Sequence, residues 1–258
     1  MSAPESKRVK TDEAPYELIY WPALPGRGEF IRLLFEEAGE SYVDKAKQDP
    51  DNVVQEVLGF MGSTDTGNNP AIFASPILRH GDLLLSQTPA ILQYLAPRLG
   101  LSPKEGNGVH HLNAIVLTLI DGFVTELHDT HHPIAVSQNY EDQKPEAKKR
   151  AKAFIDERIP KFLGYAQRVL DSKSSGNGPW LYGDSLTYAD IVLFQGLDGT
   201  TFAFPKTIAT LKESGKYAGV FALYDAVKER PNIKAYLESG RRQKYSNGIW
   251  RHYPEFEE

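Results

Sequence analysis

The sequence predicts an α/β domain followed by an all-α helical domain, and three observations carry this prediction. Short β-branched and aromatic runs alternate with helical patterns only between residues 16 and 97. Beyond residue 108, apolar residues recur at helical spacing alone. A linker that contains Pro, Gly and Ser, residues 99–108, separates the two patterns, and 258 residues are enough for two domains.

The α/β part begins with a predicted strand–helix–strand unit. Residues 16–21 (YELIYW) are rich in strand-forming side chains, and residues 22–28 form a turn rich in Pro and Gly. Residues 41–46 are the second strand, which an intervening crossover helix makes parallel to the first. That helix stops at Gly39 and is predicted from apolar residues at helical spacing, namely Phe30, Ile31, Leu34, Phe35 and Ala38.

A short helix, a hairpin and a capped helix complete this part. Residues 52–61 are expected to form the short helix. Two apolar runs, residues 76–79 and 83–85, flank a Gly-containing turn and predict a β-hairpin. Thr88 is expected to cap the next helix, with Pro89 at the first helical position.

The helical part is predicted from two apolar stripes and three further segments. A helix over residues 110–130 carries the first stripe, which comprises Leu112, Ile115, Val116, Leu119, Ile120, Phe123 and Leu127. The second stripe, with a kink at Pro160, comprises Ala147, Ala151, Phe154, Ile155, Phe162, Tyr165, Ala166 and Val169. The further segments are residues 187–203, 216–228 and 231–240, and a capping box of Thr187 and Asp190 opens the first of them.

Composition and charge limit the classes of function. The net charge is −5, from 29 Lys and Arg against 34 Asp and Glu, which argues against a nucleic-acid binder. The chain has no cysteine, which excludes a disulfide, a zinc–cysteine site and a cysteine nucleophile. Residues 1–14 are polar and charged and predict a disordered tail without a secretory signal. No apolar run is expected to span a membrane, so we expect a soluble, cytoplasmic protein.

Three polar residues lie at positions that suit ligand binding. Tyr20 ends the first strand and Arg27 stands at the start of the next helix, in the crevice where α/β units bind ligands. Packing of Tyr20 and a surface ion pair of Arg27 are the alternative interpretation. Asp121 lies on the polar face of the long helix, which is either solvated or meets the cleft or a partner subunit.

Two dipeptides flank the predicted hairpin. Ser75 precedes Pro76 at a strand start, where a cis bond would leave the backbone of Ser75 free to pair with a peptide-like ligand, and an ordinary trans bond is the alternative. Gln87 and Thr88 precede a helix, whose N-terminus offers a hydroxyl and backbone N–H groups to a carboxylate. The alternative is that Thr88 only caps its own helix.

A pair of histidines raises the question of a metal. His128 and His132 are four residues apart and share a helix face with Asp121 and Thr125. No third ligand stands at a recognisable spacing, and Pro133 ends the helix at once. A metal-dependent hydrolase would use these histidines, but we expect no metal and attribute them to the helix C-terminus, where histidine is favourable.

Taken together, these segments resemble the glutathione transferase superfamily. The family's order is kept from residue 16 to residue 240. The chain looks most like the tyrosine-type, sigma-like classes, because Tyr20 replaces the serine or cysteine of other classes. It also resembles a fungal or bacterial branch. The resemblance is carried by Tyr20 with Trp21, Gly26 with Arg27, Ser75 with Pro76, residues 80–95 (HGDLLLSQTPAILQYL), residues 119–122 (LIDG) and residues 182–194 (YGDSLTYADIVLF).

The resemblance implies the glutathione transferase fold and its domain limits. Residues 15–98 would form a thioredoxin-like, glutathione-binding domain, and residues 108–243 an all-helical domain. A homodimer and glutathione as cosubstrate are also implied, without a metal, a nucleic acid or a membrane. Residues 244–258 extend past the usual fold, and this tail either closes over the electrophile pocket or packs on the surface.

The resemblance also implies roles for single residues. Tyr20 matches the hydroxyl that binds the glutathione sulfur, and the backbone of Ser75, before Pro76, matches the group that pairs with the cysteinyl part. Gln87 and Thr88 match the pair that holds the γ-glutamyl carboxylate. Arg27 matches a basic residue near that site. Asp121 matches an acid that reaches the γ-glutamyl amine across the dimer interface. The residues expected in the electrophile pocket are Trp21, His128, Phe204 and Trp250.

These residue types suit catalysis that uses the thiol of glutathione. A free thiol has a pKa of about 8.5, and an O–H donated by Tyr20 stabilises the thiolate and lowers that pKa. The resemblance therefore implies a detoxifying transferase that conjugates glutathione to small apolar electrophiles. The alternatives are a glutathione-dependent peroxidase or isomerase and a non-catalytic structural or assembly module of the same fold. The missing cysteine excludes the cysteine-type branch of the family.

Overall fold

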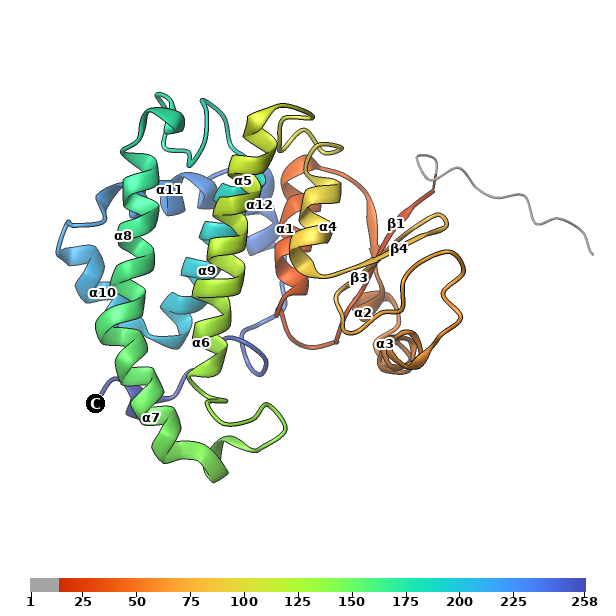
Figure 1. The fold of residues 1–258 in the computed structure, drawn as a ribbon, viewed down its shortest axis with the longest axis horizontal. Helices are drawn as coiled ribbons and strands as arrows, with labels where there is room; N and C mark the ends of the chain where they lie inside the picture. Colours follow the sequence, from red (N-terminus) through yellow and green to blue (C-terminus); the bar gives the residue numbers. More distant parts are fainter. Residues whose placement is uncertain (1–13) are drawn as a thin grey trace, which may run out of the picture.

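The computed structural model describes residues 14–258 and has a small sheet domain at one end and a helical bundle at the other (Figure 1). The predicted tail, residues 1–14, lies outside the described residues except for its last residue. The strands of the sheet domain are β1 (Tyr16–Ile19), β2 (Tyr42–Asp44), β3 (Ile77–His80) and β4 (Leu83–Ser86). Its helices are α1 (Gly28–Ala38), α2 (Lys45–Gln48), α3 (Val53–Gly62) and α4 (Thr88–Leu95).

The sheet has the strand order β2-β1-β3-β4. β1 and β2 are parallel, as the crossover helix α1 predicts, and β3 and β4 form the predicted antiparallel hairpin. The second strand is shorter than the predicted residues 41–46, because the pairing with β1 ends at Asp44 and the chain turns into α2, which the sequence pattern did not predict.

The helical half follows the predicted stripes, with two π-helical turns that were not expected. The first long helix comprises α5 (Asn107–Leu117), the π turn η2 (Thr118–Val124) and α6 (Thr125–Asp129). The second comprises α7 (Lys144–Ala153), the π turn η4 (Phe154–Arg158) and α8 (Ile159–Leu170). The remaining helices are α9 (Tyr188–Ala203), α10 (Pro205–Glu213), α11 (Ala218–Lys228) and α12 (Pro231–Glu238), with short 3₁₀ turns at η3 (Tyr140–Gln143), η5 (Lys173–Ser175) and η6 (Pro254–Phe256).

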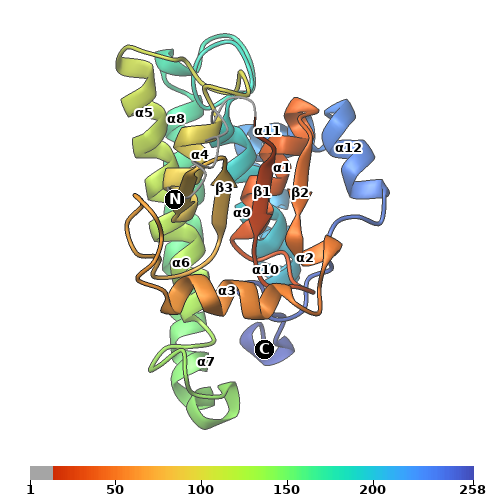
Figure 2. The same cartoon turned by 90° about the vertical axis from the view of Figure 1, so that its right-hand side faces the viewer.

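One hydrophobic core runs through both halves of the molecule. It includes Leu18 on the sheet, Phe30 on α1 and Phe194 on α9, all fully buried. α1 and α4 therefore lie between the sheet and the helical bundle (Figure 1). A smaller cluster on the other face of the sheet joins Ile19 and Val57, and Figure 2 shows α3 running across the strands there.

The helix from Asn107 to Asp129 is long and apolar enough to cross a membrane, judged by length and composition. Core helices that are buried inside a folded protein pass the same test, so the expectation that no segment spans a membrane stays a prediction. The physical reason for the apolar composition is core packing, because Leu112, Val116 and Ile120 on this helix are fully buried.

Candidate functional site

Three predicted ligand-binding positions meet at one edge of the sheet. Ile19 at the end of β1 pairs with Ile77 at the start of β3, which pairs with Ser86 at the end of β4. The next positions along the chain are Tyr20 and Gln87, and Pro76 directly precedes Ile77. The register of the sheet, rather than proximity in sequence, brings these groups together.

The hydroxyl of Tyr20 is held by the turn that follows it. Its oxygen accepts the backbone N–H of Arg27 at 2.9 Å, and a Cβ at Gly26 or Gly28 would collide with the tyrosine. Burial raises the pKa of Tyr20 above its ordinary value. The phenol therefore keeps its proton at neutral pH, and since Arg27 occupies the oxygen as a donor, the tyrosine O–H remains able to donate.

Arg27 links the sheet domain to the helical domain. Its Nη2 donates to Oγ1 of Thr125 on α6 at 2.9 Å. Burial lowers the pKa of the Arg27 guanidinium, while Tyr20 and Asp121 act electrostatically in the opposite direction. Sequence patterns could not predict the pairing of Arg27 with Thr125, because the contact joins two domains.

The hairpin contributes unusual backbone and two buried hydroxyls. The Ser75–Pro76 peptide bond is cis. Gln87 has φ 72° and ψ 116°, a region that non-glycine residues rarely adopt and that concentrates at ligand sites. Oγ of Ser75 and Oγ1 of Thr88 are buried without a hydrogen-bond partner among the described residues.

The expected capping role of Thr88 was wrong. Gln87 occupies the N-cap position of α4 without a side-chain cap, and Thr88 is the first helical residue. A hydroxyl inside the first turn with a helical backbone is not placed as a cap, so the Thr88 hydroxyl is left unpaired beside the N-terminus of α4.

Asp121 lies on the π turn η2 and is exposed. The prediction that it shares a straight helical line with Thr125, His128 and His132 assumed α-helical spacing throughout. Thr125 Oγ1 instead bonds the carbonyl of Ile120, five residues earlier, within the wider turn. A π turn rotates the residues before it relative to those after it, and such turns are frequent at functional sites.

The residues predicted for the electrophile pocket separate into two groups. Trp21 and His128 are partly exposed. Phe204 and Trp250 are each only 1% exposed and belong to the continuous core. These two side chains are therefore packing residues in this structure and do not line an open pocket. A cavity of about 620 Å³ lies elsewhere, between Lys148, Thr210 and Phe256.

The C-terminal tail packs against the turn that follows Tyr20. Ser246 donates to the carbonyl of Ala23 at 3.3 Å, and the carbonyl of Ile249 contacts Nε2 of His131 at 2.8 Å. The Trp250 ring then fills the space left by Gly199, where a Cβ would collide with it. The tail thus borders the candidate site and places Trp250 in the core of the bundle.

His131, which the sequence analysis did not single out, completes a cluster with His128 and His132. One ring nitrogen of each lies within 4.8 Å of the others. Burial lowers the pKa of His128 to about 4 and that of His131 to about 3. The expectation that no third ligand stands at a recognisable spacing was therefore wrong, because His131 lies three residues after His128 on the same helix end.

Comparison with known proteins gives a consistent result. Residues 128–240 match the family described as "Glutathione S-transferase, C-terminal domain". A glutathione S-transferase of Plasmodium falciparum is 26% identical over 234 residues, which cover 88% of this chain and 98% of that protein. Glutathione S-transferase P of Caenorhabditis elegans is 32% identical over 164 residues, which cover 63% of this chain and 68% of that protein.

A solved structure agrees on the fold. The Pi-class glutathione S-transferase of Onchocerca volvulus superimposes with a TM-score of 0.65 at 23% identity, covering 92% of this chain and 99% of that one. The predicted two-part architecture is therefore confirmed. These relatives come from a malaria parasite and from nematodes, so the sigma-like assignment and the fungal or bacterial branch stay predictions.

Proposed function

The chain belongs to the glutathione S-transferase family, and from that premise we propose that it conjugates the glutathione thiolate to small apolar electrophiles. The observation that carries the proposal is the Tyr20 hydroxyl, which accepts the Arg27 N–H and keeps its own proton. A protonated donor at the edge of the sheet can hydrogen-bond to a thiolate and favour its charged form.

Glutathione binding is proposed to use the groups around that hydroxyl. The Ser75 backbone would pair with the cysteinyl part, and Thr88 with the N-terminal N–H groups of α4 would hold the γ-glutamyl carboxylate. Gln87 would contribute to the same subsite, which its unusual backbone and exposure support. Arg27 would supply positive charge nearby, and Asp121 of a second subunit would meet the γ-glutamyl amine.

The proposed reaction uses these residues, the two substrates and water. The thiol of bound glutathione loses its proton to water, and Tyr20 stabilises the thiolate by hydrogen bonding. The sulfur then forms a bond to an electrophilic carbon, and the leaving group departs with its electron pair. Each unit by which the thiol pKa falls represents about 1.4 kcal/mol of thiolate stabilisation, and positioning of the two reactants contributes further.

The wider setting is proposed from the same family membership. A homodimer in the cytoplasm with a detoxifying role is consistent with a protein that binds glutathione and apolar electrophiles. Trp21 and His128, both partly exposed, are the proposed contacts of the electrophile.

Replacement of Tyr20 by phenylalanine tests the mechanism. Tyr20→Phe should bind glutathione with nearly unchanged affinity, raise the pKa of the bound thiol by about 1–2 units and lower turnover of an aryl halide at least about tenfold. The thiolate absorbance followed against pH measures the first effect, and steady-state kinetics the second.

Tyr42→Phe is the matched control, because it removes a hydroxyl of the same domain that donates to Glu36. Unchanged turnover in Tyr20→Phe would remove Tyr20 from the mechanism. Tight glutathione binding by the wild-type protein without turnover of any electrophile would instead favour the non-catalytic alternative.

A further inference from the structure

Three histidines converge at the C-terminal end of α6. His128 is on α6, and His131 and His132 follow directly, with ring centroids 5.0, 5.2 and 4.8 Å apart in the three pairs. One ring nitrogen of each lies within 4.8 Å of the others. Around a tetrahedral zinc ion, nitrogens at the usual bond length lie about 3.3 Å apart. Small side-chain rotations of the two partly exposed members, His128 and His132, would close this difference.

The hydrogen bonding of His131 leaves a lone pair without a partner. Its Nε2 lies 2.8 Å from the carbonyl oxygen of Ile249, and since a carbonyl only accepts, Nε2 carries the proton. Nδ1 is therefore the unprotonated nitrogen. This atom is buried and has no partner among the described residues, and the side chain is 1% exposed. A buried lone pair without a donor is unfavourable unless something binds it.

The surroundings of His132 also suit a metal ligand. Its Nδ1 lies 3.4 Å from the amide nitrogen of Gln143, but the two hydrogens of that amide already serve the nearer carbonyls of Ala135 and Gln138, at 3.0 and 3.2 Å. No hydrogen of that amide is then left for the His132 ring. A neutral imidazole has one unprotonated nitrogen, so the ring keeps a lone pair that a metal can use.

We propose that His128, His131 and His132 bind a zinc ion, with its fourth position open to water. Metal-binding histidines characteristically donate their second ring N–H to a backbone carbonyl or carboxylate, and His131 has this arrangement through Ile249. Imidazole ligands suit zinc and the neighbouring divalent transition metals. The site shares His128 with the proposed contacts of the electrophile, and His128 is one helical turn from Thr125, the partner of Arg27.

Charges around the cluster set the expected strength of binding. The positive charges of Arg27 and Arg251 act on His128, whereas the negative charge of Asp129 acts on His132. The two guanidinium groups oppose a divalent cation. We therefore expect weaker affinity than that of a zinc site that a domain needs in order to fold.

Zinc binding would also hold the C-terminal tail. His131 bonds Ile249 in the tail, and His128 and His132 belong to the helix end and the loop after it. A ligand that binds only the folded chain raises the midpoint temperature of thermal unfolding. For a chain of this size, we expect a rise of roughly 3–10 °C when the zinc concentration is about a hundredfold above the dissociation constant.

The test is titration of zinc chloride into the full chain, without a histidine tag and without glutathione, by calorimetry and thermal unfolding. The wild-type protein should bind one zinc per chain and show the rise in midpoint. Cobalt(II) should give the visible absorption of a tetrahedral site. His132→Gln and His128→Gln should each weaken zinc binding at least about tenfold.

The matched control is the double variant His110→Gln, His111→Gln, which removes two exposed histidines of α5 and should bind zinc as the wild type does. His131→Ala is informative only if circular dichroism shows it folded, so the two partly exposed positions carry the test. No saturable binding by the wild type, or equal affinity in His132→Gln, would overturn the proposal. Loss of zinc binding in the control variant would also overturn the proposal.

Discussion

The Ser75 and Thr88 hydroxyls, at the edge of the sheet, are buried without a partner among the described residues. An unpaired buried hydroxyl costs roughly 1–3 kcal/mol, so a fold that retains two of them beside a strained residue is suited to a polar ligand. Gln87, with φ 72°, is that residue. The family resemblance indicated this site, but the unpaired hydroxyls and the backbone strain were visible only in three dimensions.

Thr88→Val separates binding from folding. The substitution keeps the shape and removes the unpaired hydroxyl, so the free energy of unfolding of the ligand-free protein should be unchanged or slightly higher. Glutathione should bind about tenfold more weakly, a loss of about 1.4 kcal/mol. Calorimetry and urea unfolding measure the two quantities.

Thr200→Val is the control, since that hydroxyl donates to the carbonyl of Gly196 at 2.7 Å. It should lower stability by about 1 kcal/mol and leave the affinity for glutathione unchanged. An equal affinity in Thr88→Val would exclude the hydroxyl from the carboxylate site.

At the scale of single elements, the start of α9 shows how a short motif fixes a helix. The predicted capping box is present: Asp190 accepts the backbone N–H and the hydroxyl of Thr187, at 2.7 and 2.9 Å. It also accepts the backbone N–H of Leu181 at 2.7 Å, a contact beyond the motif. One buried carboxylate therefore ties the preceding loop to a helix that runs through the core.

Asp190→Ala should lower the free energy of unfolding by about 3 kcal/mol, because it leaves buried donors unpaired as well as removing a helix cap. Denaturation in urea gives this difference directly. Asp184→Ala provides the comparison: its carboxylate is exposed, accepts the Asn177 N–H at 2.9 Å and should cost less than about 1 kcal/mol. Similar losses in the two variants would contradict the importance given to burial.

The whole molecule is joined across its two parts by the C-terminal tail. The ring of Trp250 is buried, 5.9 Å from Phe30 of α1 and 5.6 Å from Tyr245 between ring centroids. Gly199 on α9 leaves the space that the ring fills. The tail is thus part of the core, although in the sequence it reads as an extension.

Trp250→Ala should lower the free energy of unfolding by about 3–5 kcal/mol, the usual cost of a large cavity in a core. Limited proteolysis should also cut the tail faster than in the wild type. His252→Ala, an exposed residue two positions later, should do neither. A tail that stays protected in Trp250→Ala would show that other contacts hold it.

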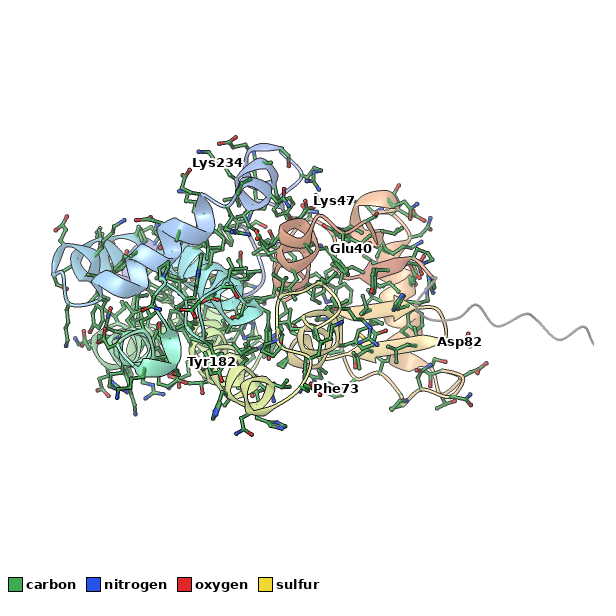
Figure 3. The ribbon with its side chains drawn as sticks, turned by 90° about the horizontal axis from the view of Figure 1, so that it is seen from above. Glu40, Lys47, Phe73, Asp82, Tyr182 and Lys234 are labelled. Atoms are coloured by element: carbon green, nitrogen blue, oxygen red, sulfur yellow. The ribbon has the colours of Figure 1, made fainter. Side chains whose placement is uncertain are left out.

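Phe73 is a candidate contact between the two subunits of the proposed homodimer. Phe73, in the loop before β3, is 86% exposed, and Figure 3 shows it on the edge of the molecule where Tyr182 also lies. Burying an exposed phenylalanine is worth about 1.5–3 kcal/mol. If Phe73 is covered by a second subunit, Phe73→Ser should raise the dimer dissociation constant about 10–100-fold in sedimentation experiments.

Val136→Ser, at another exposed apolar position that is 69% exposed, is the control and should leave the association unchanged. A wild-type protein that sediments as a monomer at all concentrations would contradict the proposed dimer. An unaltered dimer in Phe73→Ser would place the interface elsewhere.

The sequence by itself determined the two-part architecture, the parallel first unit, the hairpin and the capping box of Thr187 and Asp190. Each of these depends on local periodicity, turn residues or side chains within a few positions, so each can be recognised without knowing the rest of the chain. The order of the family's motifs likewise identified Tyr20 and the hairpin residues as candidates for the site.

Only the tertiary structure decided which of these residues meet and in what state. The Arg27–Thr125 bond, the bond between His131 and Ile249 and the burial of Phe204 and Trp250 all depend on contacts between distant segments. The two π turns also shifted helix faces that regular α-helical spacing had assigned. Local patterns report the periodicity of a segment, whereas exposure, partners and pKa arise from packing between segments.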